Sequence, residues 1–430
     1  MTTTLDPAPP TAPARARTVL VRALVPAFLV VLPALVMRIG GLHTAALGQV
    51  LVFGAAVVAA SFLLAWAAEA AEVDVSGGLA VAVLAFIAVL PEYAVDLYYA
   101  YTGGSDPAYE AYAAANMTGS NRLLLGLGWP VVVLVALWFA RRATGRRQSV
   151  LRLEEGRLEL GFLLIAGIVA FVVPLTAQIH IVLGVLLIAW FVVYLYKLTR
   201  GEAEEPDLVG VAAAIGGLPK VGRRWTVVLL FVVAAAIIVA CAEPFADSLV
   251  EAGGQLGVDQ FLLVQWLAPL ASEAPEFIVA IIFATRGKGG AAMAMLISAK
   301  VNQWTLLVGS LPIAYTLGGG HGSLPLDGRQ VEEVLLTATQ TLMGVAILLA
   351  LRFQRWAAVT LLVLFAAQFA ITSTPARLVL SAVYAVIALV MFVVHRRQIL
   401  PTLRAPFARD PAGDEVADVA AEPVAADVRA

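Results

Sequence analysis

The sequence predicts an all-α polytopic membrane protein, with about twelve transmembrane helices that include two inverted five-helix repeats. Three observations support this fold class. The 430-residue chain is 61% hydrophobic and only 13% charged, a balance typical of proteins solvated by a bilayer. Apolar stretches of about 20 residues, the length of a spanning helix, recur from Leu20 to Val394. Two pairs of similar segments also lie an odd number of these stretches apart.

Both ends of the chain differ in composition from the apolar body. Residues 1–17 are rich in Pro and Thr, and residues 398–430 are rich in Ala, Asp and Glu, so both are predicted to be disordered tails. The first apolar run lacks a small-residue cleavage site and is interpreted as a retained helix. A net charge of −2 argues against nucleic acid as a partner. The single cysteine, Cys241, excludes an internal disulfide.

Hydropathy places the spans. The predicted ranges are 20–38, 46–72, 77–101, 110–140, 158–174, 178–197, 225–251, 258–285, 289–317, 330–351, 355–373 and 376–395. The fourth and ninth spans are long, and glycine and proline interrupt them at 126–130 and 309–312.

The distribution of basic residues predicts the orientation. With the amino terminus in the cytoplasm, the connections on that side hold most of the Arg and Lys. The opposite connections hold little beyond Arg38, Arg329 and Arg377. We therefore expect an integral protein of a bacterial plasma (inner) membrane, with both termini cytoplasmic.

Internal similarity predicts the repeats. Residues 90–95 (LPEYAV) match 274–279 (APEFIV), and residues 151–159 match 324–332. Both pairs lie five spans apart, and five is odd, so the second copy must cross the membrane upside down. The predicted parts are an extra helix in 18–45, a first repeat at 46–200, a cytoplasmic linker at 201–224, a second repeat at 225–374 and an extra helix in 375–397.

A Pro-Glu pair lies inside one span of each repeat, at Glu92 and Glu276. Proline frees carbonyl oxygens of the preceding turn, and a carboxylate beside them suits Na⁺, Ca²⁺ or a proton. The alternative is a proline kink whose glutamate is capped by a neighbouring helix. Two pairs at matching positions disfavour it, because an intramembrane charge costs at least ~2.5–3.5 kcal/mol on insertion scales. Glu92 and Glu276 are therefore the predicted metal-binding residues.

More polar residues surround these glutamates. Asp96 and Glu273 each share a helix face with a Pro-Glu glutamate, although either could instead face an aqueous funnel. Asn116 begins a polar element (116–121, NMTGSN) that could ligate a cation or only pack against a neighbouring helix. Lys300 stands at the matching position of the second repeat, where it could tune the charge of the site or reach to the cytoplasmic surface.

At 90–92, 116–121 and 274–276 the chain resembles the cation/calcium antiporter superfamily, the sodium/calcium exchangers among them. The resemblance implies two inverted five-helix halves, each with an alpha repeat, here about 77–140 and 258–317. It implies that Glu92 and Glu276 are the central cation-binding carboxylates and that Asn116 is a ligand from the neighbouring helix.

The chain departs from that family's pattern. Members of that family usually carry the motif Gly-Thr-Ser-x-Pro-Glu. Here the Thr and Ser hydroxyls are both missing from the first copy, and only Ser272 remains in the second, beside Glu273. The second Asn…Gly-Ser-Asn element has become Lys300…Gln303-Trp304-Thr305. An ammonium can occupy one cation position, so sodium/proton or cation/proton exchange is favoured over standard sodium/calcium exchange.

The predicted function is a secondary active cation antiporter that exchanges Na⁺ or Ca²⁺ against Na⁺ or H⁺ by alternating access. The expected partners are the lipid bilayer and small inorganic cations. No ATP-binding motif, nucleophile–base pair or His-x-x-x-His cluster is present, so we expect neither a cofactor nor an enzyme. One alternative is a cation channel, which would require a pore between symmetric subunits or a filter of carbonyl groups. The other is a non-transporting membrane protein with the same scaffold.

Overall fold

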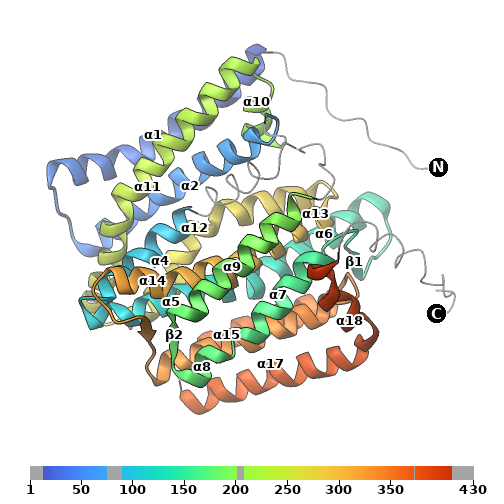
Figure 1. The fold of residues 1–430 in the computed structure, drawn as a ribbon. Coiled ribbons are helices and arrows are strands. Elements are labelled where there is room, and N and C mark those ends of the chain that lie inside the picture. Colours follow the sequence, from blue (N-terminus) through green and yellow to red (C-terminus); the bar gives the residue numbers. More distant parts are fainter. Residues whose placement is uncertain (1–12, 75–89, 201–207, 372, 409–430) are drawn as a thin grey trace. The chain divides into compact units, whose positions relative to one another are not determined.

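The computed structural model describes residues 13–74, 90–200, 208–371 and 373–408, which are almost entirely helical (Figure 1). The chain forms two compact units. Unit 1 comprises Met1–Val95 and Ala203–Leu256, and unit 2 comprises Asp96–Glu202 and Gly257–Ala430. The units do not follow the predicted repeats, because each contains helices from both of them.

Unit 1 is built from helices α1 (Pro13–Gly40), α2 (Ala46–Ala71), α10 (Gly210–Gly216) and α11 (Lys220–Leu256). Helices α2 and α11 pack along each other. At Gly54 of α2 a Cβ atom would lie 2.8 Å from the Phe245 ring of α11, so the absent side chain permits close approach. Helix α4 (Leu90–Gly103) contributes its first residues to this unit.

Two predicted boundaries in unit 1 were wrong. Helix α1 begins at Pro13, inside the predicted tail 1–17. Helix α10 and the first turn of α11 lie inside the predicted linker 201–224. The physical reason for α10 is burial: Ala212, Ala214 and Ile215 pack against α2, and this apolar face stabilises the short helix.

Unit 2 holds the remaining elements. They are α5 (Pro107–Leu123), η1 (Leu124–Gly128), α6 (Trp129–Thr144), β1 (Val150–Arg152), α7 (Arg157–Val169), α8 (Val172–Thr176), β2 (Gln178–His180), α9 (Ile181–Leu198), α12 (Gln260–Thr285), α13 (Gly289–Asn302), η2 (Gln303–Leu307), α14 (Val308–Leu317), β3 (Ser323–Pro325), α15 (Gly328–Leu348), β4 (Arg352–Gln354), α16 (Arg355–Ala367), η3 (Gln368–Ala370), α17 (Thr374–Val394), α18 (Arg396–Arg404) and η4 (Ala405–Phe407).

The all-α polytopic character is confirmed. Within the described ranges ten helices are long and apolar enough to cross a membrane, and Arg355–Ala370 is a shorter apolar helix. Helix α4 is described over 14 residues, because most of the predicted span 77–101 lies outside the described ranges. The number twelve therefore stays a prediction.

The two interrupted spans are continuous helices that each contain one π-helical turn. In the first, η1 overlaps the predicted interruption at 126–130 and ends two residues before Pro130. In the second, η2 precedes the predicted interruption at 309–312. A proline lacks a backbone donor for the preceding turn. A wider π turn absorbs such irregularity without ending the helix, and such turns are frequent at functional sites.

Four short strands link the two repeats in a reciprocal pattern. Strand β1 pairs with β4, and β2 pairs with β3, both antiparallel. The matching segments 151–159 and 324–332 adopt the same strand–turn–helix conformation, since β1 leads into α7 and β3 leads into α15. Each strand therefore pairs with the non-equivalent strand of the other repeat, as expected for two inverted copies.

The predicted carboxy-terminal tail 398–430 was also wrong at its start, because α18 and η4 are helical through Phe407. Helix α18 packs on α7 at Gly161, where a Cβ atom would overlap the carbonyl oxygen of Thr402. Arg157 Nη1 donates to Gln398 Oε1 at 2.9 Å. Sequence composition could not reveal this docking surface on α7.

Candidate functional site

Lys300 on α13 is completely buried. Its Nζ donates to Asn121 Oδ1 at 2.8 Å and also to the Asn121 backbone carbonyl. The Trp304 ring centroid lies 5.8 Å from the same nitrogen. Lys300 thus points to the last residue of the first repeat's polar element, and the alternative that it reaches the cytoplasmic surface is wrong.

Glu273 and Gln303, two departures from the family pattern, contact each other. Gln303 Nε2 donates to Glu273 Oε1 at 2.7 Å, and both side chains are buried. Glu273 lies on α12 and Gln303 begins the π turn η2. The bond therefore fixes the acid-bearing helix against the irregular turn of its neighbour.

Asn116 on α5 is buried, and neither polar atom of its side chain has a hydrogen-bond partner among the residues described. A buried amide without partners is costly, so such a group is a candidate ligand. Ser272, also buried, donates its hydroxyl to Ala268 O at 3.2 Å, which leaves its oxygen as an acceptor.

The remaining predicted residues divide between the units. Glu92, buried in the first described turn of α4, belongs to unit 1. Asp96, one turn further along α4, is completely buried and belongs to unit 2. Glu276 is half-buried on α12 and follows Pro275 inside that helix. Within unit 2, the structure thus brings Lys300 to Asn121 and Glu273 to Gln303.

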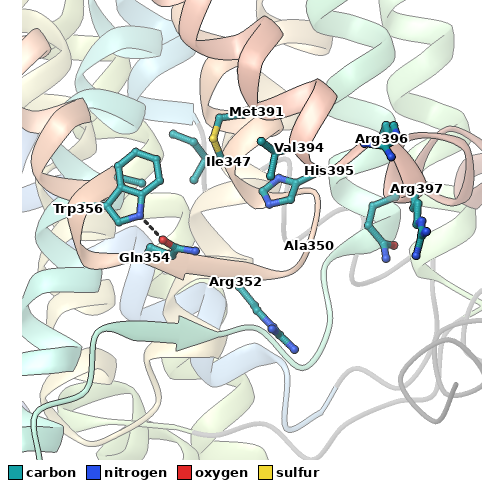
Figure 2. Close-up of a pocket in the computed structure, with 12 residues that line it drawn as sticks. Ile347, Ala350, Arg352, Gln354, Trp356, Met391, Val394, His395, Arg396 and Arg397 are labelled. Atoms are coloured by element: carbon teal, nitrogen blue, oxygen red, sulfur yellow. Dashed lines mark hydrogen bonds between the residues drawn. The ribbon is translucent and has the colours of Figure 1, made fainter. Parts of the chain in front are cut away.

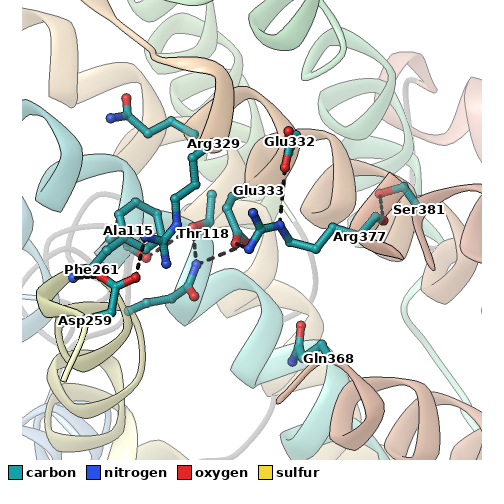
Figure 3. A network of polar contacts seen from close by, with 12 residues as sticks. Ala115, Thr118, Asp259, Phe261, Arg329, Glu332, Glu333, Gln368, Arg377 and Ser381 are labelled. Carbon is teal, nitrogen blue, oxygen red and sulfur yellow. Dashed lines mark hydrogen bonds and ion pairs between the residues drawn. The ribbon is translucent and has the colours of Figure 1, made fainter. Parts of the chain in front are cut away.

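Sequence reasoning missed a second polar cluster in unit 2. Arg122 Nη2 lies 2.6 Å from Glu333 Oε2, and the side chains are only 2% and 4% exposed. Gln265 Nε2 of α12 bridges Thr118 Oγ1 at 3.2 Å and Glu333 Oε2 at 3.3 Å (Figure 3). Thr118 belongs to the polar element 116–121, so the cluster reaches the candidate ligand segment. The signal available in the sequence was a charged residue inside each of two apolar spans, Arg122 in one and Glu333 in the other.

Other groups complete this cluster around the guanidinium. Arg122 Nη1 donates to Gln368 Oε1 at 3.2 Å, and its Cζ lies 5.1 Å from the Trp266 ring centroid. Arg377 of α17 lies 3.3 Å from Glu332 and 3.8 Å from Glu333 (Figure 3). Helices α5, α12, α15 and α17 are therefore connected by buried polar contacts.

A glycine brings the two site-bearing helices together. A Cβ atom at Gly119 of α5 would overlap the Gln265 carbonyl oxygen of α12. Only glycine allows backbones to approach so closely. Helix α12 carries Glu273 and Glu276, so this contact sets their distance from Asn116 on α5.

The three arginines on the predicted exterior side are all paired with carboxylates. Arg38 lies 2.5 Å from Glu243, Arg329 lies 2.5 Å from Asp259, and Arg377 lies 3.3 Å from Glu332. Figure 3 shows the last two pairs. Each of these arginines therefore has a carboxylate partner within the folded protein.

An ion pair in unit 1 fixes the end of α2. Arg223 donates to both carboxylate oxygens of Asp74 at 2.7 and 2.8 Å, and Arg224 donates at 3.3 Å. The hydrogen bonds from Arg223 lower the pKa of Asp74 to about 2. No group of three or more His, Cys, Asp or Glu suited to a metal occurs among the residues that the structure describes.

Comparisons with known proteins agree with this architecture. The chain is similar to the crystal structure of the H⁺/Ca²⁺ exchanger CAX, with 41% identity over 92% of this chain and 98% of that chain and a TM-score of 0.85. The fold is shared with native YfkE, at 16% identity over 84% and 99% of the two chains and a TM-score of 0.59. It is also shared with the sodium-calcium exchanger NCX_Mj, at 17% identity over 76% and 99% and a TM-score of 0.50.

No curated protein matches the chain. A family model described as sodium/calcium exchanger protein matches residues 45–200 and 226–393, which together are most of the chain. Members of this family are membrane antiporters rather than enzymes, and they need no cofactor. The sequence resemblance is thereby confirmed, and the chain belongs to the sodium/calcium exchanger family within the cation/calcium antiporter superfamily.

Proposed function

We propose that this protein exchanges Ca²⁺ against H⁺ by alternating access, with Glu92 and Glu276 as the carboxylates that bind the ion and compete for protons. The observation that carries the proposal is that residues replacing the family's usual oxygen ligands bond to other side chains of the protein. Lys300 donates to Asn121, and Gln303 donates to Glu273. These groups are engaged where a sodium-dependent exchanger would keep oxygens for Na⁺.

Charge balance supports a divalent ion. With Asp96 counted as protonated, a buried Lys300 ammonium and a buried Glu273 carboxylate offset each other, so Glu92 and Glu276 leave a net charge of −2. That charge matches one Ca²⁺ or two protons. Carboxylates are ligands for Ca²⁺ and also bind protons, so the same two groups can hold either one Ca²⁺ or two protons. In this proposal Asn116 and Ser272 add neutral oxygens, and Asp96 tunes the site.

The similarity to the H⁺/Ca²⁺ exchanger CAX favours the same ion pair. Na⁺/H⁺ exchange is the second candidate, since the buried ammonium of Lys300 lowers the negative charge available to a divalent ion if Glu273 is protonated. Both candidates use protons, and they differ in the cation that is moved.

Proteoliposomes with imposed gradients test the proposal. A pH gradient should drive uptake of Ca²⁺, measured with an enclosed calcium indicator, whereas an equal Na⁺ gradient should not. Glu92→Gln and Glu276→Gln should each abolish uptake, because the amide keeps the shape but loses the charge. Glu154→Gln, at an exposed glutamate in the connection before α7, is the matched control and should transport normally. Uptake driven equally by Na⁺, or normal rates in both site variants, would overturn the proposal.

The proposed orientation is tested separately. Single cysteines introduced on a Cys241→Ala background should label from the cytoplasmic side within 141–157 and from the exterior within 103–107. Labelling of both segments from one side would contradict the inverted-repeat arrangement.

A further inference from the structure

A cavity of about 430 Å³ lies in unit 2 where α15 and α17 end and where β4 and the first turn of α18 meet (Figure 2). One part of its lining is basic, from Arg352, Arg396 and Arg397. Another part is apolar and includes Met391 and Val394 of α17. This volume falls in the range of small-molecule sites.

Two of the basic residues that line this cavity, Arg396 and Arg397, are not paired with acids among the described residues. None of the described residues that line it is acidic. Arg396 and Arg397 are exposed, and neither has a carboxylate partner within the described part of the chain. The arginines of the predicted exterior side, Arg329 among them, are each paired with an acid. The α18 side of the cavity therefore presents the positive charge of Arg396 and Arg397 to whatever enters it.

Hydrogen bonds within the fold hold the lining of this cavity in place. His395 Nδ1 lies 2.9 Å from the Ala346 carbonyl oxygen, which ties the end of α17 to α15. Trp356 Nε1 donates to Gln354 Oε1, so the indole is held at the rim (Figure 2). An exposed tryptophan beside arginines, at the end of membrane-spanning helices, is typical of the membrane interface.

We propose that this cavity binds the phosphate group of an anionic phospholipid, with Arg396 and Arg397 as the phosphate-binding residues and the α17 surface contacting the acyl chains. Free phosphate offers the same group, but it would gain nothing from the apolar wall. The exposed Val390, Val393 and Val394 continue that wall along α17. Basic pockets between helices on the cytoplasmic side are suited to anionic headgroups. The site is independent of the ion-exchange proposal, because none of its residues belongs to the ion site.

Native mass spectrometry of the detergent-purified full chain tests the proposal. The probes are dioleoyl phosphatidylglycerol, dioleoyl phosphatidylcholine and inorganic phosphate, each titrated alone. The wild type should retain phosphatidylglycerol in preference to phosphatidylcholine. The Arg396→Gln/Arg397→Gln variant should weaken phosphatidylglycerol binding roughly 25-fold, since each basic residue near an anionic surface contributes about fivefold.

The matched control is Arg141→Gln/Arg142→Gln, two exposed arginines at the end of α6 on the same predicted side. This variant removes the same charge but should leave the preference unchanged. Trp356→Ala, which keeps every arginine, should weaken lipid binding without affecting that of inorganic phosphate. Equal losses in the two double variants, equal retention of both lipids, or binding of inorganic phosphate as strong as that of the lipid would overturn the proposal.

Discussion

Breaking the buried pair of Arg122 and Glu333 should destabilise the protein more than removing both charges together. The two atoms lie 2.6 Å apart, and both side chains are almost completely buried. Removing one partner leaves an uncompensated buried charge, which costs about 3–5 kcal/mol. Glu333→Gln should therefore lower the free energy of unfolding by about this amount, because it leaves the buried Arg122 guanidinium without its carboxylate.

The double variant Arg122→Leu/Glu333→Leu removes both charges and replaces them with apolar side chains of comparable size. Such replacements of buried pairs are often neutral or stabilising by about 1–4 kcal/mol. We expect its apparent melting temperature in detergent to lie close to that of the wild type and well above that of Glu333→Gln. With the single variants Arg122→Leu and Glu333→Leu added, the non-additivity of the double-mutant cycle measures the coupling between the two residues.

The matched control is a more exposed pair in the same unit. Arg329 and Asp259 are 30% and 41% exposed, so breaking their ion pair should cost no more than about 1 kcal/mol. Asp259→Asn suits this purpose, because asparagine can still accept the hydrogen bond that Asp259 Oδ1 receives from Phe261 N at the start of α12. If Glu333→Gln costs as little as Asp259→Asn, or if the double variant is no better than Glu333→Gln, the reasoning is refuted.

Three further predictions concern single residues. Replacing Lys300 with Asn or Gln should weaken proton coupling and favour divalent ions; transport profiles that stay unchanged between about pH 6 and pH 9 would remove Lys300 from the mechanism. Asp74→Asn should lower the melting temperature by a constant amount from pH 8 to about pH 5. The pKa of Asp74 is lowered from 3.8 to about 2 in the folded protein, so the stabilisation by Arg223 is fully present above pH ~3.8 and is lost as the pH falls through 2. A difference that vanished near pH 6 would contradict this. Gly119→Ala should prevent normal packing against Gln265 and reduce the yield of folded protein, measured by size-exclusion chromatography; a normal yield would show that α5 and α12 can separate.

The membrane class and most of the helices could be predicted from the sequence because lipid imposes a length and an apolar composition on each span. The predicted range 289–317 matches its helix completely, and 258–285 begins two residues before α12. The failures have a shared cause. Helix α18 depends on a docking surface at Gly161, and α10 depends on burial against α2, neither of which is local in sequence.

The candidate site was predictable where a local motif marked it and not where distant partners decide it. Pro-Glu pairs identified Glu92 and Glu276, and register with Asn116 drew attention to Lys300. The actual partner of Lys300, Asn121, lies on another helix, and so does the partner of Arg122. Contact between side chains far apart in the chain follows from packing, which a single sequence does not contain.

The reciprocal pairing of the four short strands bears on how the molecule is assembled. During synthesis β1 leaves the ribosome about 200 residues before β4, and β2 is also made before β3. The backbone groups of both early strands therefore remain unpaired until the second half has been inserted. A polypeptide that ends after the first half would contain β1 and β2 without their pairing partners, β4 and β3. If the two halves were produced as separate polypeptides, each should be degraded when made alone and recovered when both are made together. That result would mean that pairing between the strands makes the stability of each half depend on the presence of the other.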